Sequence, residues 1–427
     1  MRHPAVIAAA VLLAALASVA VVEPVPSYDP WSWLLWGREV AHGTLSTAEG
    51  PAFKPLPVAV CALLSPLGDL APEAWVVLAR AAGIGAVVLA FVVARHLAST
   101  GAGLLAAAAV ALCGSYAGLA ATGAIEPMVV CLALAGLLAW QRDMPRAALA
   151  AGVACALLRV EAWPFVALLG LVLWRRRPQD RALLVALAVA VPALWFVPEW
   201  LGSGDPLRSG TRARVPNPGQ PALADVPLLA SLGDALELVL LPLWLGGAAL
   251  ALRRRTPAAT LAAAGAAWIV LVAVMAQAGF SGEARYAVPG AALLSIAGAV
   301  ELTRSRALAA LAVAAVAVAA LPRLDDARDV RTGQAYQARL AEDLTHAITA
   351  AGGRRTLLAC GRPYTGQYRG PLTAYALDVE KRRIGFDPRA PGVVLRSALR
   401  AGADPAPALL RRGDVVRHGL WTVQTTC

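Results

Sequence analysis

The residues best suited to chemistry in this chain are acids and arginines at the ends of apolar runs. Asp29 lies in SYDPWSWLLW, Glu126 begins one apolar run, and Arg159 and Glu161 flank the turn in LLRVEAWPF. An ionisable side chain at membrane depth costs on the order of 2.5–3.5 kcal/mol on insertion scales, so such groups are normally paired or functional. A carboxylate can deprotonate a hydroxyl, and a guanidinium can stabilise a departing phosphate. These residues therefore indicate transfer chemistry on a phosphate-bearing substrate.

Further cations lie near the same ends. Arg80 is inside an apolar run, Lys54 follows a polar loop, and Arg285 lies in GFSGEARYAVPG. We expect Lys54, Arg80 and Arg285 to meet at one lipid phosphate, with Arg159 as a fourth member, because desolvation strengthens contacts between fixed cations and an anion. The alternative is structural: Arg159 and Arg285 would pair with neighbouring glutamates, and Arg80 would extend towards the interface.

Asp29 is the first candidate for a general base. It precedes Pro30 and an aromatic segment, so its backbone is stiff, and a carboxylate near its ordinary pKa of about 3.9 is ionised at neutral pH. Helix capping is the alternative role, because an aspartate followed by a proline is a favoured helix start. If Asp29 is only a cap, Glu126 or Glu39 is the next candidate for the base.

The rest of the chain is too apolar for a soluble protein of its size. Of its 427 residues 59% are hydrophobic and 15% charged, with a mean hydropathy of +0.63. These values predict an α-helical polytopic membrane protein with about eleven spans, although the sixth run could continue the fifth as one kinked helix broken at Arg159–Pro164. The runs cover residues 5–22, 74–94, 101–120, 126–140, 147–160, 162–174, 181–200, 235–252, 258–279, 286–302 and 307–321.

The loops between these runs predict the orientation of the chain. Arginines concentrate in the loops that face inward if the N-terminus is cytoplasmic, as the positive-inside rule requires. We therefore expect a plasma-membrane protein with residues 23–73, 202–233 and 323–427 outside. Within the first outer loop, WSWLLW (31–36) is expected to lie along the membrane surface, because tryptophan favours the headgroup layer. The run 56–70 is too short to span and is expected to be re-entrant or in-plane.

The composition changes near Pro322 and predicts two domains. Residues 1–322 would form the membrane domain, with its outer loop 23–73, and residues 323–427 a small extracytoplasmic α/β or α+β domain. In this exported domain the pattern predicts a helix and then strands. The helix is expected at 334–351, and the strands at 355–360, 371–378 and 392–397, with a last pair around 418–419.

Two of the six cysteines, Cys360 and Cys427, fall in the exported domain, where oxidation is possible. We expect a disulfide between them, which on the loop-entropy account would stabilise the domain by about 4–5 kcal/mol; two free thiols are the alternative. The other cysteines lie in apolar runs, where a thiol is usually a small buried side chain. Neither the cysteine spacing nor the five scattered histidines match a metal motif, so no zinc or haem site is expected.

The expected substrate follows from what is absent from the sequence. No GxxxxGK[ST] loop is present, and there is no ATP outside the membrane, so an outward-facing transferase must use an activated group carried by a lipid. A polyprenyl-phosphate sugar fits, because phosphate is already a good leaving group. One base with cations would then suffice, without the paired acid and base of glycosidases. The formal net charge of +11 is attributed to genomic base composition and not to nucleic-acid binding.

The order of these features resembles the GT-C superfamily of polyprenyl-phosphate-sugar-dependent glycosyltransferases. The resemblance covers about residues 1–322 and is carried by SYDPWSWLLWGREV, GPAFKPLPV, GAIEP, R-x-E-A-W-P-F and S-G-x-x-R-Y-x-x-P. It implies that Asp29 is the catalytic carboxylate, that Glu126 is a second acid, and that Arg285 and Tyr286 contact the donor phosphate. Many relatives have two adjacent acids in the first loop, whereas Pro30 follows Asp29 here, so a Mg²⁺ or Mn²⁺ cofactor stays an open question.

The resemblance implies an inverting transfer of sugar to a glycan, lipid or protein acceptor of the envelope, on the outer face of the membrane. Two other classes remain. A transporter or flippase of lipid-linked sugars would also need cations, but it should carry charges at mid-bilayer and on the inner side, which are nearly absent here apart from loop arginines. A non-catalytic envelope scaffold would account for the exported domain but not for Arg80.

Overall fold

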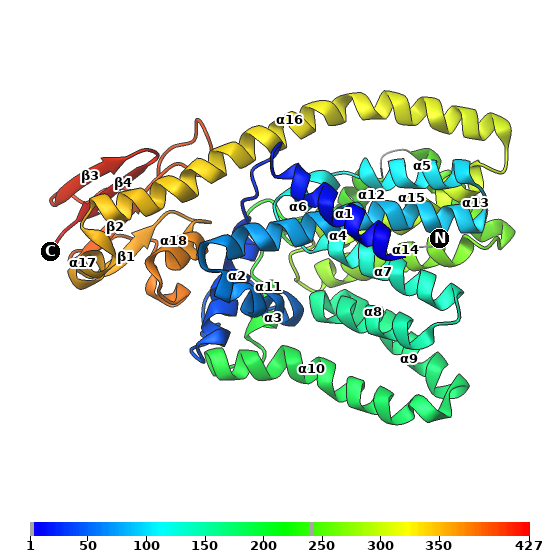
Figure 1. Cartoon of the computed structure of the whole chain (residues 1–427), viewed down its shortest axis with the longest axis horizontal. Helices are drawn as coiled ribbons and strands as arrows, with labels where there is room; N and C mark the ends of the chain where they lie inside the picture. The colour runs from blue at the N-terminus through cyan, green and yellow to red at the C-terminus, as the bar shows by residue number, and fades with distance from the viewer. Residues whose placement is uncertain (1–3, 240–241) are drawn as a thin grey trace. The chain divides into compact units, whose positions relative to one another are not determined.

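The computed structural model describes residues 4–239 and 242–427, and most of these are helical (Figure 1). The helices are α1 (Pro4–Ser18), α2 (Tyr28–Ala41), α3 (Pro55–Leu64), α4 (Ala71–Leu97), α5 (Thr100–Ala111), α6 (Tyr116–Ala121), α7 (Glu126–Gln141), α8 (Pro145–Leu158), α9 (Trp163–Arg176), α10 (Arg181–Ser203), α11 (Arg208–Ala213), α12 (Pro227–Leu238), α13 (Pro242–Arg254), α14 (Ala259–Gln277), α15 (Val288–Leu302), α16 (Arg306–Ala350), α17 (Gly353–Cys360) and α18 (Gly370–Leu377). The strands are β1 (Arg362–Thr365), β2 (Gly392–Arg396), β3 (Asp414–His418) and β4 (Trp421–Thr425).

The helices confirm a polytopic membrane protein. In the described ranges four helical segments are long and apolar enough to cross a membrane: Pro55–Leu97, Pro178–Ser203, Ala259–Gln277 and Arg306–Ala350. Shorter apolar helices occupy Ala5–Ser18, Thr100–Ala111, Glu126–Gln141 and Pro145–Leu158. The expected run 101–120 is two helices, α5 and α6, separated by Ser115 in a left-handed conformation with φ 62°. The number of spans, eleven by sequence, stays a prediction.

Contacts along the chain divide it into two compact units. The first comprises Met1–Ala17, Val77–Trp195 and Gly210–Arg328, and the second Ser18–Val76, Phe196–Ser209 and Asp329–Cys427. The second unit therefore groups the first loop with the C-terminal residues, whereas the sequence suggested one boundary at residue 322. That position lies inside α16, a continuous helix of 45 residues with Pro322 within it. The helix expected at 334–351 is accordingly the end of α16.

The first unit is built around α15, in which every residue except the partly buried Leu293 is buried. It packs closely against α13 and α14, because glycines face glycines at the crossings. A Cβ atom on Gly290 would lie 2.7 Å from the carbonyl oxygen of Gly265, and one on Gly247 would lie 2.7 Å from that of Gly298. Small residues thus set the distance between these helices.

The chain between α8 and α9 forms a break and not a kink within one helix. Arg159 is extended, with φ −145° and ψ 132°, and a 3₁₀ turn over Val160–Ala162 follows it. Pro164 then lies in the first turn of α9, where its missing N–H costs nothing. The expectation of one kinked element is therefore wrong, and Arg159 is presented by an extended backbone.

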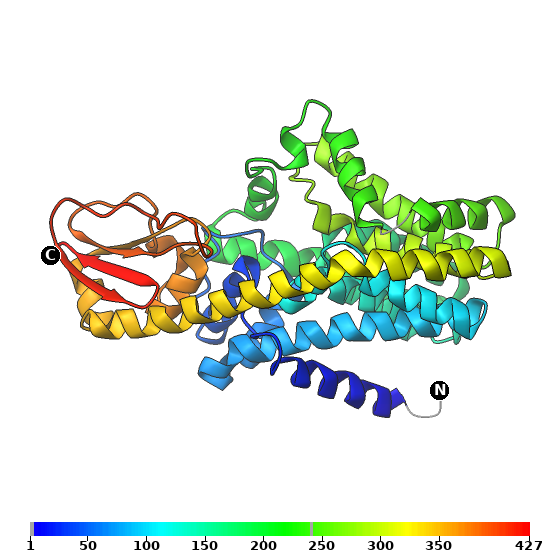
Figure 2. The same ribbon diagram turned by 90° about the horizontal axis from the view of Figure 1, so that it is seen from above.

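In the second unit, a four-stranded sheet has the order β1-β2-β4-β3 and lies beside the end of α16 (Figure 2). Strands β1 and β2 are parallel, whereas β2–β4 and β4–β3 are antiparallel. The indole of Trp421 donates to the carbonyl oxygen of Leu340 in α16 at 2.7 Å. The strands predicted at 392–397 and around 418–419 are confirmed.

The strands predicted at 355–360 and 371–378 are wrong, because these segments form α17 and α18. Both are short apolar runs, which do not distinguish a strand from a helix by periodicity. The segment GPLTAYAL has a proline in its first helical turn and is rich in alanine and leucine, which favour helix. Strand β1 lies between the two helices and was not predicted.

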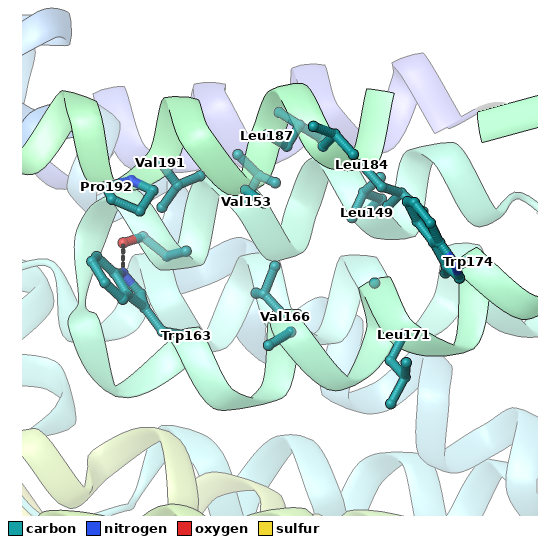
Figure 3. Close-up of a pocket in the computed structure, with 15 residues that line it drawn as sticks. Leu149, Val153, Trp163, Val166, Leu171, Trp174, Leu184, Leu187, Val191 and Pro192 are labelled. Atoms are coloured by element: carbon teal, nitrogen blue, oxygen red, sulfur yellow. Dashed lines mark hydrogen bonds between the residues drawn. The ribbon is translucent and has the colours of Figure 1, made fainter. Parts of the chain in front are cut away.

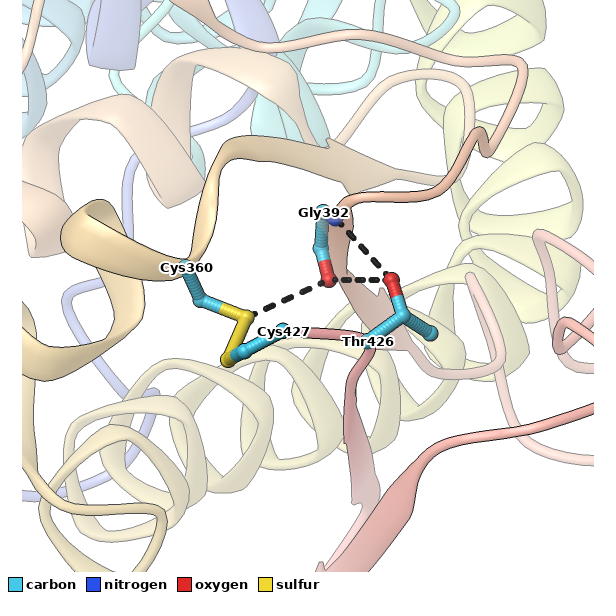
Figure 4. The surroundings of a disulfide bond; sticks show 4 residues. All are labelled: Cys360, Gly392, Thr426 and Cys427. Atoms are coloured by element: carbon cyan, nitrogen blue, oxygen red, sulfur yellow. Dashed lines mark hydrogen bonds between the residues drawn. A yellow bond between two sulfur atoms is a disulfide. The ribbon is translucent and has the colours of Figure 1, made fainter.

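The C-terminal residues are closed into a loop by a disulfide bond between Cys360, at the end of α17, and Cys427 (Figure 4). Their Cα atoms are 4.9 Å apart, although 67 positions separate them in the sequence. The hydroxyl of the neighbouring Thr426 bonds with the backbone of Gly392 in β2. The pairing is the one expected from the sequence.

The first loop folds into α2 and α3, which pack tightly: a Cβ atom on Gly37 would lie 2.6 Å from the backbone nitrogen of Ala62. The helix expected at WSWLLW is present, but its tryptophans are buried in protein and do not line a free surface. Trp33 contacts Trp75 edge-on at 5.5 Å, and Trp36 is fully buried. The expected role of these tryptophans as interfacial anchors is therefore wrong.

The short run 56–70 is α3 followed by a 3₁₀ turn over Ser65–Leu70. Gly68 interrupts the helical backbone there with φ 57°, a conformation that glycine adopts without strain. The run is thus separated from α4 by a bend, and its expected re-entrant or in-plane position stays a prediction.

Candidate active site

A buried cluster of charges in the first unit is centred on Arg159. Its Nη1 donates to Glu126 Oε1 at 2.9 Å, its Nη2 donates to Glu161 Oε1 at 2.5 Å, and its Nε donates to Glu161 Oε2 at 3.2 Å. The face of the guanidinium lies over the Tyr286 ring, 3.8 Å from its centre. The structure therefore brings together three residues predicted for the site, Glu126, Arg159 and Tyr286, and adds Glu161.

Local structure explains how these side chains meet. Glu126 opens α7 and is followed by a proline, and Arg159 caps the end of α8 with an extended backbone. Tyr286 belongs to a 3₁₀ turn over Ala284–Ala287, just before α15. The indole of Trp268 in α14 donates to the carbonyl oxygen of Tyr286 at 2.8 Å and fixes this turn. The start of α7, the end of α8 and the turn before α15 thus contribute to one cluster.

The charge balance of the cluster changes the expected role of Arg159. Glu126, Arg159 and Glu161 are only 2%, 5% and 5% exposed, so two carboxylates neutralise one guanidinium in a place with little water. All three nitrogens of Arg159 already donate to these carboxylates. A phosphate placed against Arg159 would meet two negative charges at close range. The alternative of a local ion pair with Glu161 is therefore present in the structure.

Glu126 has an atom that can still form a hydrogen bond with a ligand. Its Oε1 accepts from Arg159, but its Oε2 is buried without a hydrogen-bond partner among the described residues. A buried carboxylate oxygen without a donor is costly, so it suits a partner that arrives with the substrate. A hydroxyl or an ammonium group could donate to this oxygen. The arrangement fits an acid, base or orienting role at the reacting sugar or acceptor.

Arg285 also lies near Tyr286, with its guanidinium 5.4 Å from the ring centre. It pairs with Glu283, whose other oxygen accepts from Gln220 Nε2 at 2.5 Å. The Arg285 side chain is 27% exposed, in contrast to Arg159. The tyrosine ring is thus close to one buried guanidinium and one partly exposed guanidinium.

Arg80 in α4 is 4% exposed, so the expectation that it could extend to the interface is wrong. Its Nη2 donates to the carbonyl oxygen of Ala121 at the end of α6, at 3.2 Å. A cation at a helix C-terminus is favoured by the partial negative charge there. Ala121 begins the short connection to Glu126, so Arg80 holds the segment that leads to the second acid.

Asp29 and Lys54 belong to the second unit. The N-cap of α2 is Ser27, and Asp29 lies one residue inside the helix, in its first turn. The alternative that Asp29 is the cap is therefore wrong. Lys54 is the N-cap of α3, and its Nζ lies 5.7 Å from the centre of the Trp33 ring. Both side chains come from the two helices of the first loop.

Glu39, which the sequence offered only as a substitute for Asp29, is the most perturbed acid outside the membrane helices. It is 6% exposed, and its Oε2 accepts from the backbone nitrogen of Ser46 at 2.9 Å. Its Oε1 is buried and has no hydrogen-bond partner in the described ranges. Burial raises the pKa of this carboxyl from its ordinary value to about 7, more than the Ser46 hydrogen bond lowers it.

The described part of the chain has no ready-made cluster of protein ligands for a divalent metal. Within residues 4–239 and 242–427, no group of three or more histidine, cysteine, aspartate or glutamate side chains is close enough to hold one. Glu126 and Glu161 lie near each other, but Arg159 already bridges them. Mg²⁺ is commonly held by one or two carboxylates together with substrate phosphates. A divalent cation that binds together with the donor therefore stays a prediction.

Two apolar cavities lie among the helices around the charge cluster. One of about 530 Å³ is lined by α8, α9 and α10, and Figure 3 shows Trp163 at one end of it and Trp174 at the other. The other cavity, about 360 Å³, is lined by α7, α8, α9 and α14 and includes Trp268. Trp163 donates to the carbonyl oxygen of Ala156 at 3.1 Å, so its ring is held in place. Both cavities suit an apolar chain.

No protein-family model and no curated protein matches the chain. Two solved structures of ArnT from Cupriavidus metallidurans resemble it along nearly its whole length. The one bound to undecaprenyl phosphate has 16% identity and a TM-score of 0.57, covering 99% of this chain and 98% of ArnT. The apo structure has 14% identity and a TM-score of 0.60, covering 99% and 97%. The likeness shows that this chain has the GT-C fold of ArnT.

Proposed function

We propose that the protein transfers a sugar from a polyprenyl-phosphate donor to a glycan, lipid or protein acceptor of the cell envelope, on the outer face of the plasma membrane. The observation that carries the proposal is the match of nearly the whole chain to the fold of ArnT, which was solved with undecaprenyl phosphate bound. Fold alone does not define a reaction. The buried acids and arginines described above supply the chemistry.

The apolar cavities support a lipid-borne donor. The larger one is lined by leucine, valine, alanine and tryptophan side chains, with Trp163 four positions after Arg159 in the chain. An isoprenoid chain leaves the bilayer for such a cavity at little cost, because both surroundings are apolar. A polar ligand would lose its hydration there without compensation. The cavity therefore favours the tail of the donor over a soluble sugar nucleotide.

In the proposed reaction Asp29 removes the proton from the acceptor hydroxyl. The acceptor oxygen forms a bond to the anomeric carbon while the bond from that carbon to the phosphate oxygen breaks, and the electron pair leaves with the polyprenyl phosphate. Attack opposite the leaving group inverts the anomeric configuration. Arg80 and Arg285 offset the charge of the phosphate, with Tyr286 donating its hydroxyl. Lys54 stays a further phosphate contact expected from the sequence.

Arg159 and Glu126 take other roles in this proposal. Because two carboxylates balance Arg159, it orients Glu126 and supports the ring of Tyr286 instead of carrying the phosphate. Glu126 Oε2 accepts from a hydroxyl or amino group of the sugar. Closure of the site over the donor would make each of these contacts stronger, since water is excluded.

The outer-face assignment follows from the arginine asymmetry of the loops, with the N-terminus inside and residues 323–427 outside. Fusions of a periplasmic-type and a cytoplasmic-type reporter after Cys427 test it. Activity of the reporter that requires export is expected. Activity of only the cytoplasmic reporter would contradict the orientation and the mechanism that depends on it.

Mass analysis of envelope glycans and glycolipids tests the function in cells. A strain lacking the chain should lose one sugar from a defined envelope component and accumulate its polyprenyl-phosphate donor. The wild-type chain should restore that sugar, whereas Asp29→Asn should not. Arg417→Gln, a change of an exposed arginine in β3, is the matched control and should restore it. An envelope unchanged by the deletion would contradict the proposal.

A further inference from the structure

Within the second unit, the exported C-terminal residues hold the first loop from several sides. Figure 1 shows α18 beside α2, the helix that begins next to Asp29. This contact joins two segments that the sequence places on opposite ends of the chain. A domain that served only to recruit an acceptor would not need it.

The centre of the contact is the ring of Tyr375 in α18. Arg38 of α2 lies over one face, 4.4 Å from the ring centre, and Trp31 of α2 contacts the ring at 5.2 Å. The same guanidinium donates from Nη1 to the backbone oxygen of Tyr375 at 3.2 Å and pairs with Asp378 at 3.2 Å. Asp378 ends α18 in a left-handed conformation with φ 56°, which aims its carboxylate back at Arg38.

Contacts on both flanks of α2 come from the same exported residues. Before the helix, Gln334 Nε2 donates to the backbone oxygens of Glu23 and Val25, at 3.1 and 2.8 Å. After the helix, Lys381 Nζ pairs with Glu49 at 3.3 Å. Gln334 and Lys381 are 4% and 2% exposed, so both polar groups are committed to the loop. The loop is therefore held before, along and after α2.

We propose that the exported domain is a positioning part of the transferase, and that the contact of Arg38 with Tyr375 and Asp378 fixes α2 so that Asp29 is presented in one orientation. This inference rests on the proposed function in one respect, the role of Asp29 as base. None of the three residues touches substrate; they act through the helix. A catalytic side chain misplaced by about 1 Å can cost on the order of 100-fold in rate.

Hydrogen exchange of the full-length protein tests the positioning directly. Arg38→Gln removes the stacked cation from the loop side, and Tyr375→Ala removes the ring from the domain side, so one variant remains if the other fails to fold. Amide exchange over residues 28–41 is expected to become about tenfold faster in each, because local opening is set by such tertiary contacts. Tyr375→Phe keeps the ring and should keep the slow exchange. Arg417→Gln on β3 is the control for both readouts.

Kinetics separates positioning from catalysis and from binding. Arg38→Gln and Tyr375→Ala should lower kcat by about 10- to 100-fold and leave KM for the donor within about twofold. Asp29→Asn should lower kcat without faster exchange over residues 28–41. If no sugar transfer is found at all, the proposed function fails, while the exchange result still decides the positioning. Wild-type exchange in both variants, or faster exchange with unchanged kcat, would overturn the inference.

Discussion

The guanidinium of Arg159 lies 3.8 Å from the centre of the Tyr286 ring, although the two residues come from distant turns of the chain. The same guanidinium is bonded to Glu126 and Glu161. Buried charges of this kind carry a large desolvation cost that only complete pairing offsets. The cluster therefore ties the starts of α7, α9 and α15 into one arrangement, with an acidic oxygen left for a ligand.

Removing Arg159 should destabilise the protein. In Arg159→Gln two buried carboxylates lose their common partner, which for such pairs costs about 3–5 kcal/mol of unfolding free energy. Arg159→Lys keeps the charge but cannot donate to both acids in the same geometry, so it should recover only part of the loss. Thermal unfolding of the purified proteins in one detergent measures this. A wild-type melting temperature for Arg159→Gln would show that the cluster does not stabilise the fold.

Glu126→Gln removes the negative charge of Glu126 and keeps nearly the same side-chain shape. The amide oxygen can still accept from Arg159, so folding should be retained, but the second oxygen becomes an amide nitrogen. We expect kcat to fall by about 100-fold, the lower end of what acid–base groups contribute. Steady-state transfer assays with the melting temperature as control test this. Loss of stability with normal turnover in the folded fraction would make Glu126 a structural residue.

Glu39 should make stability depend on pH. Its folded-state pKa of about 7 lies above the ordinary 4.5, so the folded chain holds the proton more tightly than the unfolded chain. The resulting stabilisation is complete below about pH 4.5 and is lost as pH rises through 7. Glu39→Gln keeps an acceptor for the Ser46 nitrogen and removes the titration. As pH rises from 5 to 8, the melting temperature of the wild type should therefore fall relative to that of Glu39→Gln. A difference between the two melting temperatures that does not change with pH would contradict the prediction.

The disulfide between Cys360 and Cys427 should protect both thiols. Alkylation of the denatured protein should modify neither residue without reductant and both after reduction, as read by peptide mass. Reduction should also lower the melting temperature of the C-terminal part, because the bond closes a long loop. Equal alkylation with and without reductant would show that the thiols are free.

The sequence predicted the class, the fold and the acids of the cluster because these depend on local chemistry. A charged residue at the end of an apolar run is unusual whether or not its partner is known. Glu126 and Arg159 could therefore be identified as candidate site residues without knowledge of their contact. Their pairing could not be predicted, since Glu126 opens α7 and Arg159 follows α8. The pairing of Arg159 with two acids is likewise visible only in the folded chain.

The position of the α2 tryptophans could not be predicted from the sequence. WSWLLW has the composition of an interfacial helix, and only tertiary contacts decide whether lipid or protein covers it. Trp33 is covered by Trp75, and Trp31 by Tyr375, residues that the sequence places far away. The segment PLTAYALD (371–378), predicted as a strand, forms α18. Tyr375 of this segment lies on α18 and packs against α2.

The most direct test of the central claim is sugar transfer by the purified protein. Wild-type and Asp29→Asn proteins in lipid nanodiscs are given polyprenyl-phosphate sugars and acceptor membranes from a strain lacking the chain, and released polyprenyl phosphate is measured by mass spectrometry. The account predicts donor-dependent release by the wild type and a rate lower by about 10²–10⁴-fold for Asp29→Asn, with unchanged melting temperature. Near-normal release by Asp29→Asn would remove Asp29 as the base, and no release by the wild type with any such donor would contradict the account as a whole.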